Sequence, residues 1–168
     1  MSKIIRDRQI VEDNATILRL NEDGSFAAVP AEGVVLVSLK QFIAQKEALL
    51  ARGNIGVWFA PDDEPEELGD EAKTLAVIAV EFPAFTDGRG FSIGRLLRER
   101  YGFTGELRAF GDVFKDTLNY LYRCGFNAFA VRADKNIEDA LKGIDDFTEY
   151  YQASVQQPQP LFRRRETV

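Results

Sequence analysis

The sequence contains no histidine and only one cysteine, Cys124. Histidine is the commonest general base and the commonest metal ligand, so its absence argues against a zinc site or a histidine-ligated haem. It also excludes a Ser–His–Asp or Cys–His mechanism within one chain. A single cysteine cannot form an internal disulfide, which favours a reducing compartment. Any acid–base chemistry would use Asp, Glu, Lys, Tyr, a bound cofactor or a partner.

Long apolar runs and an excess of positive charge are also missing. The longest apolar run, Leu75 to Val80, has the length of a strand, whereas a membrane-spanning helix needs about 18 apolar residues or more. Residues 1–7 lack the apolar region of a signal peptide. The formal net charge is −6, and nucleic-acid binding requires a basic surface. We therefore expect a cytoplasmic protein that binds neither membranes nor nucleic acid.

The 168 residues match the size of one domain, and 45% of them are hydrophobic. Short apolar runs alternate with segments of helical periodicity, which predicts an α/β fold with a mostly parallel sheet of about five strands. The predicted strands are 34–37, 55–59, 75–82, 107–110 and 128–131, and the predicted helices are 39–50, 91–101, 114–122 and 137–151. The pattern fits either a half-barrel or a flavodoxin-like open sheet. A half-barrel would leave an exposed edge and favour a homodimer.

The two ends of the chain differ from this core, which we place at residues 31–152. In residues 1–30, apolar pairs separated by polar turns predict a small β hairpin or meander that covers one edge of the sheet. Residues 153–168 are predicted to be a flexible tail that ends in a basic run, Arg163 to Arg165. That run would either bind a neighbouring chain or only improve solubility.

Parallel α/β folds bind ligands at the carboxyl ends of their strands. The densest signal there is Asp87-Gly88-Arg89-Gly90, in which two glycines allow close approach of a ligand. Ser92 is expected to cap the next helix and leave backbone N–H groups free for an anion. Arg89 would add a two-pronged contact to phosphate, a sulfur oxyanion or a carboxylate. The structural alternative is a tight turn in which Asp87 and Arg89 pair with each other.

Two further arginines lie on or after predicted strands. Arg108 interrupts an otherwise apolar strand, so it must be paired or must point into a pocket. We expect Asp112 or Asp87 to be its partner. Arg132 follows the last strand. The functional interpretation brings Arg89, Arg108 and Arg132 together around one small anion, and the alternative is a set of paired structural charges.

Cys124 follows a predicted helix and is followed by Gly125. The simplest interpretation is a buried small hydrophobic residue. The alternative is a redox-active thiol activated by Arg123, which would require exposure and a lowered pKa.

Over most of the chain after about residue 30, and most strongly from Glu81 to Phe129, the order of motifs resembles a bacterial family called domain of unknown function 934. The resemblance rests on Phe85-Thr86-Asp87-Gly88-Arg89-Gly90-Phe91-Ser92, on Gly105-Glu106-Leu107-Arg108-Ala109-Phe110-Gly111-Asp112-Val113 and on Arg123-Cys124-Gly125-Phe126. Thr117 and Asn127 depart from the pattern, because Gln and Asp are expected in relatives. The resemblance implies an accessory protein or oxidoreductase associated with assimilatory sulfite reduction, and it brings no established catalytic residue or cofactor.

Three hypotheses follow. The first is an accessory protein of sulfate and sulfite reduction that binds a small anion or a partner enzyme. The second is an oxidoreductase in which Asp87 or Asp112 is the acid–base group and a flavin or nicotinamide phosphate (NADP) is the cofactor. The third is a structural interaction module without catalysis. No metal is expected, and sulfite reduction needs metal cofactors, so the chain is not predicted to be the reductase itself.

Overall fold

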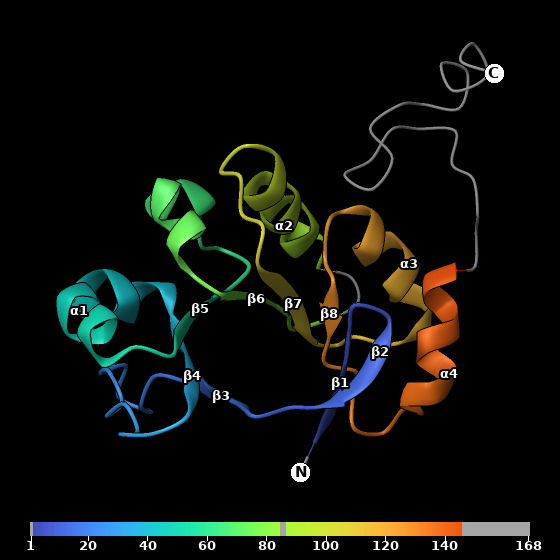
Figure 1. Ribbon diagram of the computed structural model, residues 1–168, viewed down its shortest axis with the longest axis horizontal. Helices are drawn as coiled ribbons and strands as arrows, with labels where there is room; N and C mark the ends of the chain where they lie inside the picture. The colour runs from blue at the N-terminus through green and yellow to red at the C-terminus, as the bar shows by residue number, and fades with distance from the viewer. Residues whose placement is uncertain (1, 85–86, 146–168) are drawn as a thin grey trace.

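A computed structural model of the chain describes residues 2–84 and 87–145 (Figure 1). Within these residues, eight strands form one sheet in the order β2-β1-β8-β7-β6-β5-β4-β3. Strands β3 to β8 run parallel to one another, whereas β1 is antiparallel to both β2 and β8. The strands are β1 Lys3–Arg6, β2 Gln9–Glu12, β3 Ala15–Leu18, β4 Val34–Ser38, β5 Ile55–Phe59, β6 Val77–Phe82, β7 Glu106–Gly111 and β8 Ala128–Phe129.

The helices lie along the outer side of this curved sheet (Figure 1). The α-helices are α1 Leu39–Arg52, α2 Arg89–Glu99, α3 Lys115–Arg123 and α4 Ile137–Lys142. Short 3-10 helices are η1 Pro65–Glu67, η2 Gly69–Thr74 and η3 Gly143–Asp145. The last helix was predicted to span 137–151, but α4 ends at Lys142 and the 3-10 helix η3 follows it. The chain after residue 145 lies outside the described residues, as does the predicted tail at 153–168.

The connection between two strands explains why the sheet curls. Strands β2 and β3 lie at opposite edges of the sheet, yet only Asp13 and Asn14 separate them in the sequence. In a flat sheet, seven spacings of about 4.8 Å would place these edges about 34 Å apart. Three Cα–Cα steps span at most about 11 Å. The sheet therefore forms a half-barrel, and the N-terminal segment crosses its open side (Figure 1).

Each face of the sheet has its own core. The larger core lies between the outer face and the helices and includes Val57, Phe59 and Leu107. The smaller core lies on the inner face, where Leu36, Trp58, Ala79 and Phe110 pack together. Strand residues point alternately to the two faces, so apolar residues on both faces produce the continuous apolar runs seen in the sequence.

The structure confirms the α/β class and the five parallel core strands, and it selects the half-barrel over the open sheet. The N-terminal hairpin is also confirmed, because β1 pairs with β2 and β8. Two expectations were wrong. The sheet has eight strands rather than about five, and the third N-terminal piece, Ala15–Leu18, joins the opposite edge beside β4. The homodimer stays a prediction.

Candidate functional site at the strand ends

A pocket of about 380 Å³ opens at the carboxyl ends of β6, β7 and β8, lined by Pro83, Gly111, Asp112 and Arg132. Gly111 has a φ of +99°, and a Cβ atom there would lie 2.4 Å from the carbonyl oxygen of Phe82. Glycine is therefore required at this position. The backbone N–H of Asp112 donates to the same oxygen, with a distance of 2.6 Å. These contacts hold the loop after β7 against the end of β6.

Arg132 is held on the wall of this pocket by two carboxylates. Its Nη1 atom lies 2.7 Å from Oδ1 of Asp112, and its Nη2 atom lies 3.0 Å from Oδ2 of Asp134. Hydrogen bonding to Asp112 raises the pKa of Arg132, so the guanidinium stays protonated and positively charged. Asp112 and Arg132, which were both selected because they follow predicted strands, therefore lie together at one pocket.

Asp87 and Arg89 form a separate pair on the surface. The guanidinium of Arg89 donates to both carboxylate oxygens of Asp87, at 3.0 and 2.8 Å. This hydrogen bonding holds the pKa of Asp87 below its usual range. The side chain of Arg89 is 62% exposed. The geometry matches the structural alternative of a tight turn at the start of α2.

The two glycines and the serine around Arg89 have structural explanations. Gly88, not Ser92, caps α2, which begins at Arg89, so the predicted position of the cap was wrong. Ser92 lies inside the helix and is exposed. A Cβ atom on Gly90 would lie 2.7 Å from the ring of Phe82, so glycine allows α2 to pack closely against the sheet.

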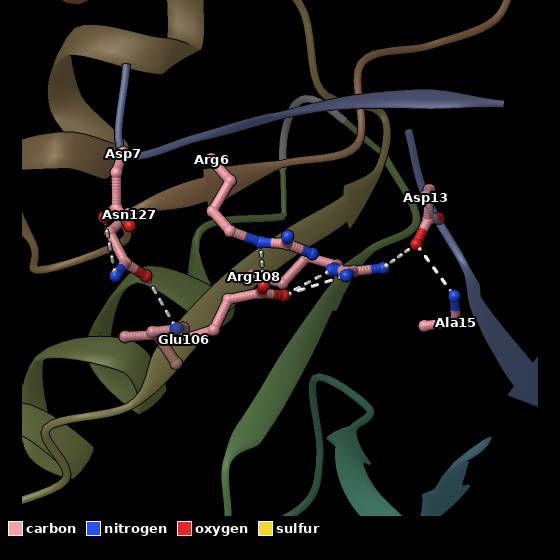
Figure 2. Close-up of polar contacts among 8 residues, drawn as sticks. Arg6, Asp7, Asp13, Ala15, Glu106, Arg108 and Asn127 are labelled. Atoms are coloured by element: carbon pink, nitrogen blue, oxygen red, sulfur yellow. Dashed lines mark hydrogen bonds and ion pairs between the residues drawn. The ribbon is translucent and has the colours of Figure 1, made fainter. Parts of the chain in front are cut away.

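Arg108 lies on the inner face of the half-barrel and is only 2% exposed. The prediction that Asp112 or Asp87 would pair with Arg108 was wrong. Its Nε atom donates to Oε2 of Glu106 at 2.8 Å, and its Nη1 atom donates to Oδ1 of Asp13 at 2.9 Å (Figure 2). Glu106 also accepts a hydrogen bond from Nε of Arg6 at 2.5 Å. We call Arg6, Glu106, Arg108 and Asp13 the inner ion chain.

The inner ion chain joins three parts of the sheet that are distant in sequence. Arg6 belongs to β1, Glu106 and Arg108 belong to β7, and Asp13 lies in the link between β2 and β3. Sequence reasoning missed Glu106, although its spacing of two residues from Arg108 places both side chains on one face of a strand. Asp13 had no local signal. The structure therefore does not bring Arg89, Arg108 and Arg132 together around one guest.

Cys124 is buried, with 6% exposure. Burial raises the pKa of its thiol to about 11, and this effect outweighs the lowering by Arg95 and Arg123. Thiolate chemistry requires the opposite environment. The structure favours the small hydrophobic residue over the redox-active thiol.

The two positions that depart from the expected family pattern also have structural contacts. Thr117 is buried, and its hydroxyl donates to the carbonyl oxygen of Phe114 at 2.8 Å near the start of α3. Asn127 accepts from the N–H of Leu107 at 2.7 Å and donates to Asp7 at 3.3 Å. It thereby ties the turn of the N-terminal hairpin to β7 (Figure 2).

Residues 56–162 match the model of a family described as bacterial proteins of unknown function, DUF934. The chain belongs to the DUF934 family. The match covers more than half of the sequence and includes all of the strand-end loops described above. No curated protein and no solved structure matches the chain significantly. The DUF934 description assigns no activity, so the function is inferred from the geometry of the site.

None of the helices within 2–84 and 87–145 is long and apolar enough to cross a membrane. Over the same residues, there is no group of three or more Cys, Asp or Glu side chains placed to hold a metal ion.

Proposed function

We propose that this DUF934 protein is an accessory protein of assimilatory sulfite reduction that binds a small oxyanion at Arg132. The observation that carries the proposal is the pocket at the strand ends, with Arg132 on its wall and Asp112 behind it. A planar guanidinium offers paired donors that suit sulfite, sulfate or phosphate. The association with sulfite reduction comes from the family resemblance.

The two carboxylates around Arg132 have different roles in this proposal. Asp112 is mostly shielded, with a side chain that is 19% exposed, and it orients the Nη1 edge. Asp134 is 59% exposed and contacts the Nε and Nη2 edge at 3.1 and 3.0 Å. Exposed ion pairs contribute little to stability. An oxyanion with two acceptor atoms can therefore replace Asp134 on that edge while Asp112 keeps the guanidinium in place.

Thermal unfolding in the presence of oxyanions tests the proposal. We expect sulfite, sulfate or phosphate to raise the melting temperature of the wild type relative to chloride at equal ionic strength, because a ligand of the folded state stabilises it. Arg132→Ala should abolish the rise. Asp134→Asn should strengthen it, because the competing carboxylate is gone.

Arg89→Ala is the matched control, since it also removes an arginine that is paired with an aspartate at a strand end. It should keep the full oxyanion response. An equal response in Arg132→Ala, or no rise with any oxyanion in the wild type, would refute the anion site.

A structural interaction module is the second candidate, and the inner ion chain favours it. The buried guanidinium of Arg108 forms ion pairs with Glu106 and Asp13, so its charge has a structural role. Loss of stability in Arg108→Ala without any oxyanion response would support this alternative. The oxidoreductase hypothesis stays a prediction, and a yellow purified protein would favour its flavin form.

A further inference from the structure

A second cluster lies on the inner face near the strand ends, on three adjacent strands. It contains Trp58 of β5, Glu81 of β6 and Phe110 of β7. The two rings are nearly perpendicular, with an interplanar angle of 85° and centroids 6.0 Å apart. Glu81 and Phe110 are direct partners in the register of β6 and β7. Because all three residues belong to the sheet, the cluster is held rigidly.

This cluster already holds a cation, the guanidinium of Arg19. The Cζ atom of Arg19 lies 5.4 Å from the ring centroid of Trp58 and 5.9 Å from that of Phe110. Its Nη2 atom lies 2.5 Å from Oε2 of Glu81. Aromatic rings together with a carboxylate form the combination that recognises guanidinium and alkylammonium groups.

The bound cation and its surroundings differ in exposure. The side chain of Arg19 is 58% exposed, whereas that of Glu81 is 16% exposed and both aromatic residues are 7% exposed. Trp58 donates a hydrogen bond from Nε1 to the carbonyl oxygen of Leu18 at 3.0 Å. That bond anchors the backbone beside Arg19, so the side chain can leave the cluster without loss of the surrounding fold.

We propose that Trp58, Glu81 and Phe110 form a binding site for the guanidinium or alkylammonium group of a small molecule. Arg19 is the internal occupant that such a ligand displaces. Guanidinium and alkylammonium groups share the required chemistry, because each is a cation that can cover an aromatic face and pair with one carboxylate. This proposal is independent of the oxyanion site at Arg132, which involves different side chains and the opposite charge.

Fluorescence of Trp58, the only tryptophan in the chain, reports directly on the site. The full chain is titrated with methylguanidinium and, separately, with tetramethylammonium, against sodium chloride at equal ionic strength. We expect a saturable change in the wild type and about tenfold tighter binding in Arg19→Ala, because the ligand no longer competes with a charged hydrogen bond. Comparing the two cations shows which type of group the site prefers.

Two further variants make the test specific. Adding Glu81→Gln to Arg19→Ala should weaken binding about tenfold or more, because the charge-assisted contact is lost. Arg95→Ala removes a different exposed ion pair, with Glu99, and should leave the titration unchanged. Arg19→Gln replaces Arg19→Ala if the alanine variant does not fold.

Three outcomes would overturn the proposal. One is the absence of a saturable response in both the wild type and the Arg19 variant. Another is binding only after Arg19 has been removed, which would make Arg19 a fixed part of the core. The third is an affinity in the double variant Arg19→Ala with Glu81→Gln that equals the affinity of Arg19→Ala alone.

Discussion

At the scale of single residues, Arg108 shows how a buried charge is accommodated. Its guanidinium is 2% exposed and lies between the carboxylates of Glu106 and Asp13. Arg108→Ala would leave both carboxylates largely shielded and without their common partner. We expect the free energy of unfolding to fall by about 3–5 kcal/mol, the usual effect of breaking a buried ion pair. Urea denaturation with a spectroscopic signal measures this change.

The control for this prediction is an arginine whose ion pair is exposed. Arg95 pairs with Glu99 one helical turn away in α2, and both side chains are about half exposed. Arg95→Ala should change the free energy of unfolding by no more than about 0.5 kcal/mol. A similar loss in both variants would contradict the structural role of Arg108.

Cys124 should make the stability of the protein depend on pH. Burial raises the pKa of its thiol to about 11 in the folded state, from an ordinary value of 9.0. Between these values the unfolded chain loses the proton while the folded chain keeps it. Stability should therefore fall as pH rises from about 9 to about 11, because the folded state binds more protons over that range.

Urea denaturation across that pH range, on the wild type and on Cys124→Ala, measures this contribution. The difference in stability between the two proteins should change with pH in the stated direction. A pH-independent difference, or rapid labelling of Cys124 by a thiol reagent in the folded protein at neutral pH, would contradict the buried thiol.

At the scale of secondary structure, the elements that depend on local pattern were predictable. The strands predicted from apolar runs correspond to β4 to β8. The helix predicted at 39–50 corresponds to α1, which ends two residues later, at Arg52, before Gly53 with a φ of +77°. The pairing of β3 was not predictable, because a short apolar segment carries no information about which edge of the sheet it joins. The cap of α2 was placed wrongly because Ser92 is a good capping residue but lies inside the helix.

In the candidate site, too, the features that depend on local pattern were predictable and those that depend on the curl of the sheet were not. The expectation that ligands bind at the carboxyl ends of strands selected Asp112 and Arg132, which the structure brings together, since it needs only the order of the strands and their ends. It failed for Arg108, which lies within β7 rather than after it and whose partner Asp13 is close only because the sheet curls. Trp58 and Glu81 were predicted only as members of strands, because nothing local indicates that Arg19 reaches them.

At the scale of the whole molecule, the N-terminal hairpin completes the half-barrel. It pairs with β8, contributes the fully buried side chains of Ile4 and Ile5, and supplies Arg6 to the inner ion chain. Deletion of residues 1–12 should therefore remove roughly 3–6 kcal/mol of apolar burial and leave β8 as an open edge.

Size-exclusion chromatography and thermal unfolding test this deletion. We expect association through the exposed edge and a lower melting temperature than in the full chain. Gln9→Ala, an exposed change within the same hairpin, should leave both measurements unchanged. A monomeric deletion variant of undiminished stability would show that the hairpin is dispensable for the fold.

The order in which the half-barrel is assembled also bears on its synthesis. The strand partner of Ile5 is Phe129, which is made 124 residues after it. At about 5–20 residues per second, the interval is roughly 6–25 seconds. During that time the N-terminal segment can form its own hairpin but has no sheet to join. Closure of the half-barrel therefore has to wait for β8, and the nascent chain carries an unburied pair of isoleucines, Ile4 and Ile5, until then.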